Sequence, residues 1–556
     1  MAQDVLEPTY APDHLLKRHL GLWHLTAAGF SGVIGSGWLV GALYAAQAAG
    51  PAAVLTWGIG GVAFIVIALV MADLGSTHPE SGALVRWPLH TNGRLTATIV
   101  GWGIWIAYCT NPPSESAVVI QYASQHVSGL YSNKRLTWAG ILVALALMAV
   151  FMMVNWYGIL LLGRVNGALS VIKWLVPMLT MVVLLATSWH GGNFTNHGGF
   201  APYGYSTALS AISTAGVIYA YTGFQAPLDL SGEARNAKRD VPRAIIIGLL
   251  LAMLLYIGLQ IAFIAAIPGS HLAHGWGGID FTSPFAQLAV VLNLGWLSWV
   301  LYGDAILSPS GSALVFTAAI SREARAMGKN ESIPRWFAHV HHGSGVPRRA
   351  LLLNFMLGAI FLLLLPSWHS IIAATSELGL FVYSITMVCQ AAFRVVEPAR
   401  ESAWFRGTAT LAPIGFVLAT LILYWAKWTN LRIALPLLAV AIGVYAWNTR
   451  SNRHTPGQVR VDVRAGAWLV LYVCAILLMS WLGSFGGGDW IPAPWDSIVV
   501  GVIGVIGYVW GVTEAVRFLR SRPGGYQPQE AEPGADPGLG DGSGTGSGAG
   551  PLIEPV

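Results

Sequence analysis

The sequence predicts an all-α protein that crosses a lipid bilayer many times, and three observations lead to this fold class. Of its 556 residues, 55% are hydrophobic and only 10% are Asp, Glu, Lys or Arg, whereas about 25% are charged in a typical soluble domain. The mean hydropathy is +0.60. Charge-free runs such as 19–72, 174–228 and 244–279 exceed the roughly 20 apolar residues that a membrane-spanning helix needs. A soluble enzyme, a coiled coil, a disordered chain and a disulfide scaffold are therefore excluded.

Turn signals inside the charge-free runs separate the individual helices. Gly50-Pro51 divides the first run, and the glycine-rich segment 191–204 divides the run 174–228. Dividing the whole chain in this way gives about 12–14 transmembrane helices. The expected helices cover residues 20–48, 52–73, 95–118, 136–157, 167–188, 206–230, 243–267, 294–320, 349–367, 369–392, 407–427, 431–448, 465–484 and 496–516.

The basic residues orient these helices in the membrane. With a cytoplasmic N-terminus, only Lys134, Arg135, Lys427 and Arg432 of the 30 Lys and Arg residues lie on the outer side. Basic loops prefer the cytoplasmic side, so we expect a multi-pass protein of the cell inner (cytoplasmic) membrane with both termini in the cytoplasm. Residues 1–19 are expected to form a cytoplasmic N-terminal segment. Residues 522–556, rich in Gly, Pro and Ser, are expected to form a disordered cytoplasmic tail.

Two of the expected helices contain residues that interrupt a regular helix. The helix 20–48 carries five glycines in the segment GFSGVIGSGWLVG (29–41), and the helix 206–230 has Gly223 followed by Pro227. Glycine costs conformational entropy in a helix, and proline removes a backbone hydrogen bond. Each helix begins a five-helix block, and interrupted helices in corresponding positions of two halves indicate an inverted-repeat transporter with a midplane substrate site. The alternative is that the glycines only permit close helix packing.

An interrupted helix leaves backbone groups open for an amino acid substrate. N–H groups at the start of a half-helix, around Ser36 and Gly37, can bind a carboxylate with help from the helix dipole. Carbonyl groups at the end of the other half-helix, around Tyr219, Ala220 and Thr222, can bind an ammonium group. The predicted substrate-binding residues are Ile34, Gly35, Ser36, Gly37, Tyr219, Ala220, Thr222, Gly223 and Gln225.

Three segments of the chain resemble one transporter superfamily. GFSGVIGSGWL (29–39), YTGFQAPLDLSGEARNAKRDVPRAI (221–245) and SREARAMGKNESIPRWFAHVHHGSGVPRRAL (321–351) resemble the amino acid, polyamine and organocation (APC) superfamily. The resemblance covers residues 20–450 and is greatest toward bacterial aspartate:proton symporter-type amino acid permeases. It implies a LeuT-like five-plus-five inverted repeat, with repeats 20–188 and 206–392 forming a transporter core over 20–392. The helices in 407–516 would then be accessory transmembrane helices.

Lys173 is the candidate for proton coupling. It lies about 10 Å into its expected helix at 1.5 Å per residue, and a buried ammonium is costly there unless it is paired or hydrated. Some proton-coupled members of the superfamily have a lysine at the matching position, which implies that Lys173 carries the proton. The alternative is a static lysine that snorkels to the inner interface. Many relatives have an acidic residue where this chain has Gln225, which cannot titrate.

Glu115, Asp304 and Glu377 are secondary candidates, because intramembrane acids are functional hypotheses by default. Glu115 follows Pro112-Pro113, and Asp304 precedes the segment Ser308-Pro309-Ser310. For Glu115 and Glu377 the alternative is a position at the outer water boundary. The three cysteines lie far apart without a pairing pattern, so no metal site or disulfide is expected.

These observations predict a secondary active transporter that imports an amino acid, with aspartate or another small amino acid as the candidate substrate, by proton symport with alternating access. The expected partners are the amino acid, protons and the bilayer, with no other cofactor and no nucleic acid. An enzyme is not expected, because H-E-x-x-H, G-x-S-x-G and P-loop motifs are missing from the sequence. The alternatives are an amino acid/polyamine exchanger and a non-transporting nutrient sensor on the same fold.

Overall fold

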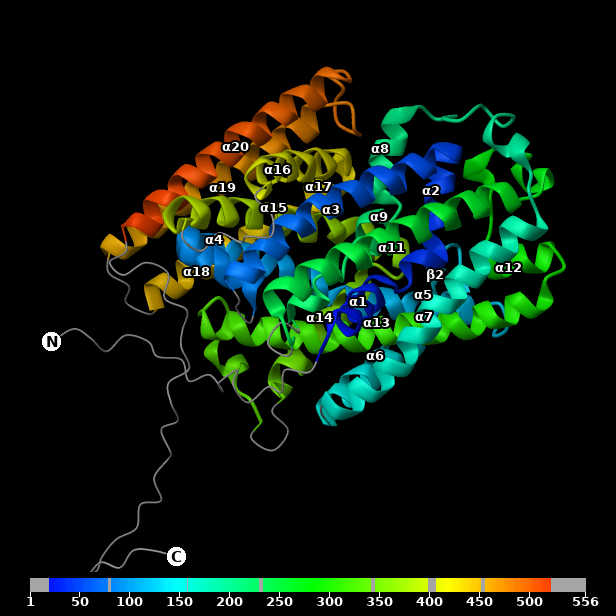
Figure 1. Ribbon diagram of the computed structural model, residues 1–556, viewed down its shortest axis with the longest axis horizontal. Coiled ribbons are helices and arrows are strands. Elements are labelled where there is room, and N and C mark those ends of the chain that lie inside the picture. Colours follow the sequence, from blue (N-terminus) through cyan, green and yellow to red (C-terminus); the bar gives the residue numbers. More distant parts are fainter. Residues whose placement is uncertain are drawn as a thin grey trace, which may run out of the picture.

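Nearly all of the chain is helical. The computed structural model describes residues 20–78, 82–157, 159–229, 234–341, 346–398, 407–451 and 456–521, so the predicted terminal segments 1–19 and 522–556 lie outside the described residues. The strands in this part of the chain form one short antiparallel hairpin, β1 (Tyr131–Ser132) with β2 (Arg135–Leu136). Figure 1 shows long helices packed side by side, with α15 and α3 inside and α6 and α20 on opposite borders.

The helices have the following bounds. The α-helices are α1 (Leu22–Val33), α2 (Gly37–Ala49), α3 (Ala53–Thr77), α4 (Ala83–Cys109), α5 (Asn111–Ala123), α6 (Trp138–Tyr157), α7 (Ile159–Thr187), α8 (Tyr205–Thr214), α9 (Val217–Tyr221), α10 (Ala226–Asp229), α11 (Ala237–Ala266), α12 (Pro284–Val291), α13 (Gly295–Lys329), α14 (Arg348–Leu364), α15 (Trp368–Val396), α16 (Thr408–Trp425), α17 (Trp428–Ala434), α18 (Leu437–Ser451), α19 (Pro456–Leu482) and α20 (Trp495–Arg520). Short 3₁₀ turns lie at Gly50–Ala52, Gly191–Phe194, Gly269–Leu272, Trp276–Gly278 and Arg335–Ala338.

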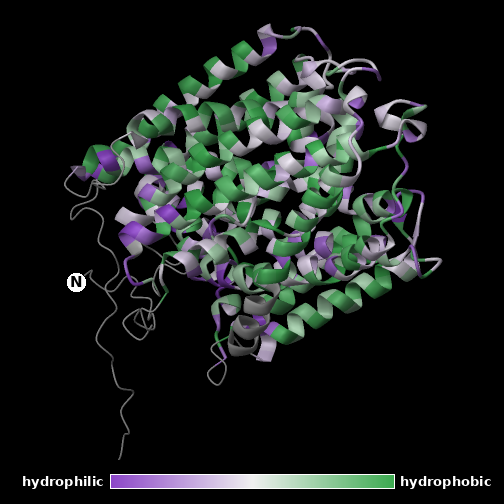
Figure 2. Ribbon diagram, turned by 45° about the vertical axis from the view of Figure 1, so that its right-hand side comes forward, coloured by the Kyte–Doolittle hydropathy of each residue, from purple (hydrophilic) through white to green (hydrophobic). Residues whose placement is uncertain are grey.

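Ten helical stretches within the described residues are long and apolar enough to cross a membrane. Hydrophobic residues extend along most of the length of the helices (Figure 2). The peripheral helices α6, α7 and α20 expose large apolar side chains such as Leu142, Leu175 and Ile506. In water such surfaces would be unfavourable, whereas in a bilayer they contact lipid. The predicted fold class, an all-α polytopic membrane protein, is confirmed.

The expected helix 95–118 begins close to a kink at Gly93, but it is wrong in its continuous course to 118. The chain instead forms α4 from Ala83 to Cys109, with a kink where Gly93 adopts φ 79°, and then begins α5 at Asn111. Pro112 and Pro113 lie in the first turn of α5, where a missing N–H costs no hydrogen bond. The proline pair therefore starts a new helix rather than lying inside one.

Three other expected helices consist of shorter pieces. The interruptions in 20–48 and 206–230 are confirmed, but the second region has an additional break at Gly216, which adopts φ 85°. The expected helix 431–448 is divided into α17 and α18 next to Pro436, because proline cannot donate its backbone hydrogen bond.

The expected helix 294–320 is longer in the structure. The helix α13 runs to Lys329 rather than to 320, since a helix can continue beyond its apolar part.

The two interrupted regions lie against each other. A Cβ atom at Gly223 would lie 2.2 Å from the carbonyl oxygen of Gly32, and a Cβ atom at Gly37 would lie 2.8 Å from the Cβ of Ala220. Glycine is therefore required by the close approach, and at Gly223 also by its φ of 96°. The small residues permit close packing and leave the helices open at the same point.

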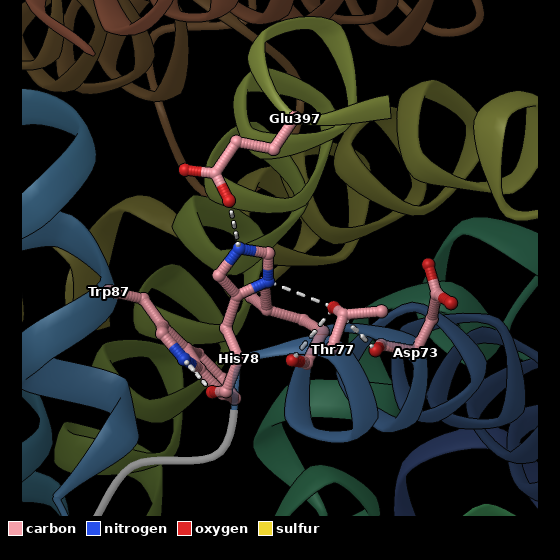
Figure 3. Close-up of polar contacts among 6 residues, drawn as sticks. Asp73, Thr77, His78, Trp87 and Glu397 are labelled. Carbon is pink, nitrogen blue, oxygen red and sulfur yellow. Dashed lines mark hydrogen bonds and ion pairs between the residues drawn. The ribbon is translucent and has the colours of Figure 1, made fainter. Parts of the chain in front are cut away.

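A buried histidine joins the end of α3 to α4 and α15 (Figure 3). The ring of His78 stacks on Phe393 with a centroid separation of 4.0 Å, and its Nε2 lies 3.6 Å from Glu397 Oε2. The indole N–H of Trp87 donates to the His78 carbonyl at 2.9 Å. These contacts hold together three helix ends that are far apart in the sequence.

Asp496 anchors the connection between α19 and α20. One of its carboxylate oxygens accepts hydrogen bonds from the Tyr424 hydroxyl (2.6 Å), the Ser484 hydroxyl (2.6 Å) and the Ser484 backbone N–H (3.2 Å). Hydrogen bonds to a charged group contribute more to stability than neutral ones. The carboxylate therefore fixes the start of α20 against the end of α16.

We expect Gly223→Ala to destabilise the protein by at least about 2 kcal/mol, because the new methyl group would overlap the Gly32 carbonyl and the backbone conformation is strained for alanine. Thermal unfolding of the detergent-solubilised protein measures the effect. Gly443→Ala in α18 is the matched control, since a Cβ atom there meets no atom within 4 Å. Equal melting temperatures for the two variants would contradict the close approach.

We expect Asp496→Asn to lower the free energy of unfolding by about 2 kcal/mol, because the amide loses the charge and directs N–H groups at hydrogen-bond donors. The melting temperature should fall accordingly. Asp489→Asn serves as control, since Asp489 is an exposed acid in the same connection. A melting temperature of the Asp496 variant equal to that of the control would show that the anchor contributes nothing.

Candidate functional site

The centre of the candidate site is the gap between α1 and α2. The helix α1 ends at Val33, Ile34 is extended, and α2 begins at Gly37 after Gly35 and Ser36. Opposite this gap, α9 ends at Tyr221, and Thr222 is extended before Gly223 turns the chain toward α10. The predicted substrate-binding residues of the two regions are therefore brought together.

A protein carboxylate occupies the start of α2. The backbone N–H of Ser36 donates to Glu115 Oε2 at 2.8 Å, and the Ser36 hydroxyl accepts a hydrogen bond from Trp368 Nε1 at 2.8 Å. Among the described residues, no hydrogen-bond partner is found for the N–H groups of Gly35 and Gly37. The structure thus corrects the expectation that the Ser36 N–H is open, because α5 supplies a carboxylate to it.

Several of the predicted carbonyl groups also have partners. The hydroxyl of Tyr256 on α11 donates to the carbonyls of Val33 (3.1 Å) and Ala220 (3.2 Å). The Tyr219 carbonyl accepts a hydrogen bond from the Thr222 hydroxyl at 2.6 Å. Tyr256 therefore caps the ends of α1 and α9 at once and satisfies carbonyls that an interrupted helix leaves unpaired.

Glu115 is buried in a network of donors. Its Oε1 accepts a hydrogen bond from the Tyr219 hydroxyl at 2.8 Å and from Asn111 Nδ2 at 3.4 Å. Only 1% of Glu115 is exposed, so the alternative of a position at the outer water boundary is not supported by this structure. A Cβ atom at Gly35 would lie 2.6 Å from Glu115 Oε1, so Gly35 makes room for the carboxylate. The ionised form of Glu115 is stabilised by these donors together with Ser36.

Lys173 points into the site from α7. Its Nζ donates to the Ser31 carbonyl on α1 at 3.1 Å, and only 1% of the residue is exposed. The ammonium group interacts electrostatically with Glu115 and Asp304. Lys173 therefore contacts the first interrupted helix and does not reach the inner interface in this structure.

Asp304 differs from Glu115 in its surroundings. It lies on α13 with 2% exposure, and no hydrogen-bond partner is found for either carboxylate oxygen among the described residues. Its electrostatic partner is Lys173. Three of the predicted ionisable residues, from α5, α7 and α13, thus form one interacting group.

Glu377 does not belong to this group. It is fully buried on α15, and neither Lys173 nor Glu115 is among the residues with which it interacts. In the described part of the chain no hydrogen-bond partner is found for its carboxylate oxygens. Its role in proton coupling stays a prediction.

Gln225 closes the site on the side of α10. Its Oε1 accepts a hydrogen bond from the Gly223 N–H at 3.2 Å, and its Nε2 donates to the Tyr108 hydroxyl. The Tyr108 hydroxyl lies 3.5 Å from that of Tyr383, and the Tyr383 ring packs edge-on against Phe224 at 5.5 Å. The amide therefore holds a layer of aromatic rings in place beside the interrupted region.

Sequence reasoning missed four polar residues that shape the site, namely Tyr108, Asn111, Tyr256 and Trp368. Tyr108, Tyr256 and Trp368 bind groups outside their own helices, and Asn111 binds the Tyr219 hydroxyl on α9 at 2.9 Å in addition to Glu115 on its own helix. No local pattern marks them, because tyrosine, tryptophan and asparagine inside an apolar run do not show which neighbour they will meet. No group of His, Cys, Asp and Glu in the described ranges is arranged to hold a metal ion.

Comparisons with known proteins give the site its context. The amino acid permease family model matches residues 20–445. The chain is 36% identical over 511 residues to the glutamate/serine transporter AimA of Bacillus subtilis, covering 89% of this chain and 94% of that protein. It is 30% identical over 500 residues to the aspartate-proton symporter of the same organism, covering 89% and 96%.

A human protein is a more distant relative. Cationic amino acid transporter 4 of Homo sapiens is 27% identical over 367 residues, which cover 63% of this chain and 56% of that protein. The residues matched by the family model include both interrupted helices and all three interacting ionisable residues. The chain belongs to the amino acid permease family of the APC superfamily, and it is a membrane transport protein rather than an enzyme.

Proposed function

We propose that this permease imports an amino acid together with a proton. The observation that carries the proposal is the Glu115 carboxylate on the Ser36 N–H. A carboxylate already lies where the start of α2 favours negative charge. The carboxylate of an amino acid substrate would bind the same N–H groups, including those of Gly35 and Gly37, and would displace Glu115.

Charge balance explains why a proton would accompany the substrate. An acidic amino acid such as glutamate or aspartate brings one net negative charge into a buried region, because its α-ammonium balances only one of its two carboxylates, and an uncompensated charge is costly there. Lys173 is the base of the interacting group, and its protonated form, the ammonium, interacts electrostatically with Glu115. Protonation of Lys173, or of the displaced Glu115, removes the excess negative charge. Binding of substrate and proton would therefore support each other.

The substrate class is proposed from the relatives. One is a glutamate/serine transporter and another an aspartate-proton symporter, so glutamate, aspartate and serine are the first candidates for this chain. Their shared α-carboxylate and α-ammonium groups would bind the start of α2 and the region of Thr222. The LeuT-like repeats 20–188 and 206–392, the inner-membrane location and the cytoplasmic termini are part of the same proposal. They are supported by the paired interruptions and the distribution of basic residues.

Reconstituted vesicles test the proposal. Radiolabelled glutamate, aspartate and serine are offered with and without an inwardly directed proton gradient, and the other amino acids and polyamines are added as competitors. Accumulation above equilibrium that disappears with the gradient supports symport. Uptake that needs an internal amino acid or polyamine instead would identify an exchanger, and no flux with retained binding would identify a sensor.

We expect Lys173→Ala to reduce proton-driven accumulation by at least ten-fold, because the site would lose its base while it retains the backbone groups that bind substrate. Accumulation ratios in vesicles under a fixed pH gradient measure the effect. Thermal unfolding of the variant checks that the protein is folded. Uphill, proton-driven uptake at the wild-type level would refute the role of Lys173.

We expect the KM of the wild-type protein to fall as the pH on the substrate side falls, because protonation of Glu115 frees the start of α2 for the substrate. Glu115→Gln should make the KM nearly independent of pH, since the amide does not titrate. Glu514→Gln is the control, because Glu514 pairs with Arg517 at 2.6 Å on α20. A wild-type pH dependence of KM in the Glu115 variant would exclude competition between Glu115 and substrate.

A further inference from the structure

We propose that Asp304 delivers the coupling proton from the outer side to Lys173. This inference rests on the proposed function and names the residue through which the proton enters. Asp304 is 2% exposed and interacts electrostatically with the buried Lys173 ammonium. It is the acid of the interacting group whose charge is not stabilised by hydrogen bonds.

The two acids of the group differ in how they hold a negative charge. Glu115 accepts hydrogen bonds from the Ser36 N–H, the Tyr219 hydroxyl and the Asn111 amide. Within the described residues no such donor is found for either oxygen of Asp304. Hydrogen bonds to an ionised group favour its charged form, and a buried group without them favours its neutral form. Asp304 is therefore the acid of the group whose charged form has the fewest stabilising contacts among the described residues.

The position of Asp304 on α13 supports a role in transfer. Asp304, Ser308 and Ser312 are spaced four residues apart and share one face of the helix. The Ser308 hydroxyl is buried without a hydrogen-bond partner in the described part of the chain. The Ser312 hydroxyl would lie 3.0 Å from a Cβ atom at Gly35, so this face reaches the gap between α1 and α2. A row of polar side chains thus runs along α13 to the gap between α1 and α2.

Asp304 also lies nearer one end of the bundle than Lys173 does. At 1.5 Å per residue it is about 13 Å from the start of α13, whereas Lys173 is about 21 Å from the end of α7. In the proposed orientation both helix ends face outward. By this measure Asp304 lies closer to the outer end of its helix than Lys173 does to the outer end of α7.

A cavity lies at this end of the bundle, and Tyr302 of α13 lines it. Its volume is about 600 Å³, and its lining includes His126, Asp280, Gln287 and Tyr302. The Tyr302 ring packs edge-on against Tyr122 at 6.2 Å, and Tyr122 interacts electrostatically with Asp304. The charged or titratable groups found to interact with Asp304 are thus Lys173 from α7 and Tyr122 from α5. Two tyrosines separate the cavity from the carboxyl group.

The proton transfer from Asp304 to Lys173 needs no other reactant. Among the described residues Lys173 Nζ donates to the Ser31 carbonyl and no hydrogen bond joins it to Asp304, so the transfer takes place when the two side chains approach. The O–H bond of the neutral Asp304 carboxyl group then breaks, and an N–H bond forms on the neutral Lys173 amine. The products are an aspartate and an ammonium that attract each other. Water from the outer cavity then returns a proton to Asp304 when Lys173 releases its own toward the inner side.

Asp304→Asn tests this assignment in vesicles. We expect proton-driven accumulation to fall at least ten-fold, whereas exchange of internal for external substrate at equal pH stays within about two-fold of wild type. The initial uptake rate of the wild-type protein should rise as the external pH falls, and the rate of the variant should be flat. Asp304→Glu should restore part of the pH response, since it returns a titrating carboxyl group.

Glu514→Gln is the control, because Glu514 is also a buried acid but pairs with Arg517 on α20 and has no part in the site. It should retain proton-driven accumulation. Wild-type accumulation in Asp304→Asn would overturn the inference, and so would loss of exchange in a folded variant, which would assign Asp304 to substrate binding. If the wild-type protein itself ignores the proton gradient, the proposed symport fails first, so the two failures are distinguishable.

Discussion

The hydrogen bond from the Ser36 N–H to Glu115 is the interaction on which the rest of the site depends. It spans 79 positions in the sequence and brings α5 against the gap between α1 and α2. Gly35 has to lack a side chain because the carboxylate occupies that space. Tyr219 reaches the same carboxylate from the second interrupted region, so one acid organises both halves of the site.

The interrupted helices are stabilised because several of the backbone groups at their open ends have hydrogen-bond partners among the described residues. Tyr256 donates to the last carbonyls of α1 and α9, and Thr222 donates to the Tyr219 carbonyl. Unpaired backbone groups at membrane depth would each cost several kcal/mol. The N–H groups of Gly35 and Gly37 are exceptions, and they lie where a carboxylate substrate would bind.

The charges inside the bundle explain why the substrate and a proton would be transported together. The base Lys173 interacts with the two acids Glu115 and Asp304, in a region where water cannot compensate an unpaired charge. An acidic amino acid, whose α-ammonium balances only one of its two carboxylates, changes this balance by one charge, and a proton restores it. Competition at α2 and proton entry at Asp304 are therefore parts of one charge-neutral cycle.

The sequence by itself determined the all-α membrane fold, most helix positions, the two interrupted regions and Lys173 as an ionisable group within a helix. These features follow from local patterns, since hydropathy, glycine and proline act on a few neighbouring residues. Only the tertiary structure decided that Glu115 occupies the Ser36 N–H, that Tyr256 caps two half-helices and that Asp304 rather than Glu377 interacts with Lys173. Which helix faces which depends on packing between segments that are over one hundred residues apart in the case of Lys173 and Asp304. Hydropathy carries no record of that choice, because these helices are apolar over most of their surface, whether a face lies against lipid or against protein.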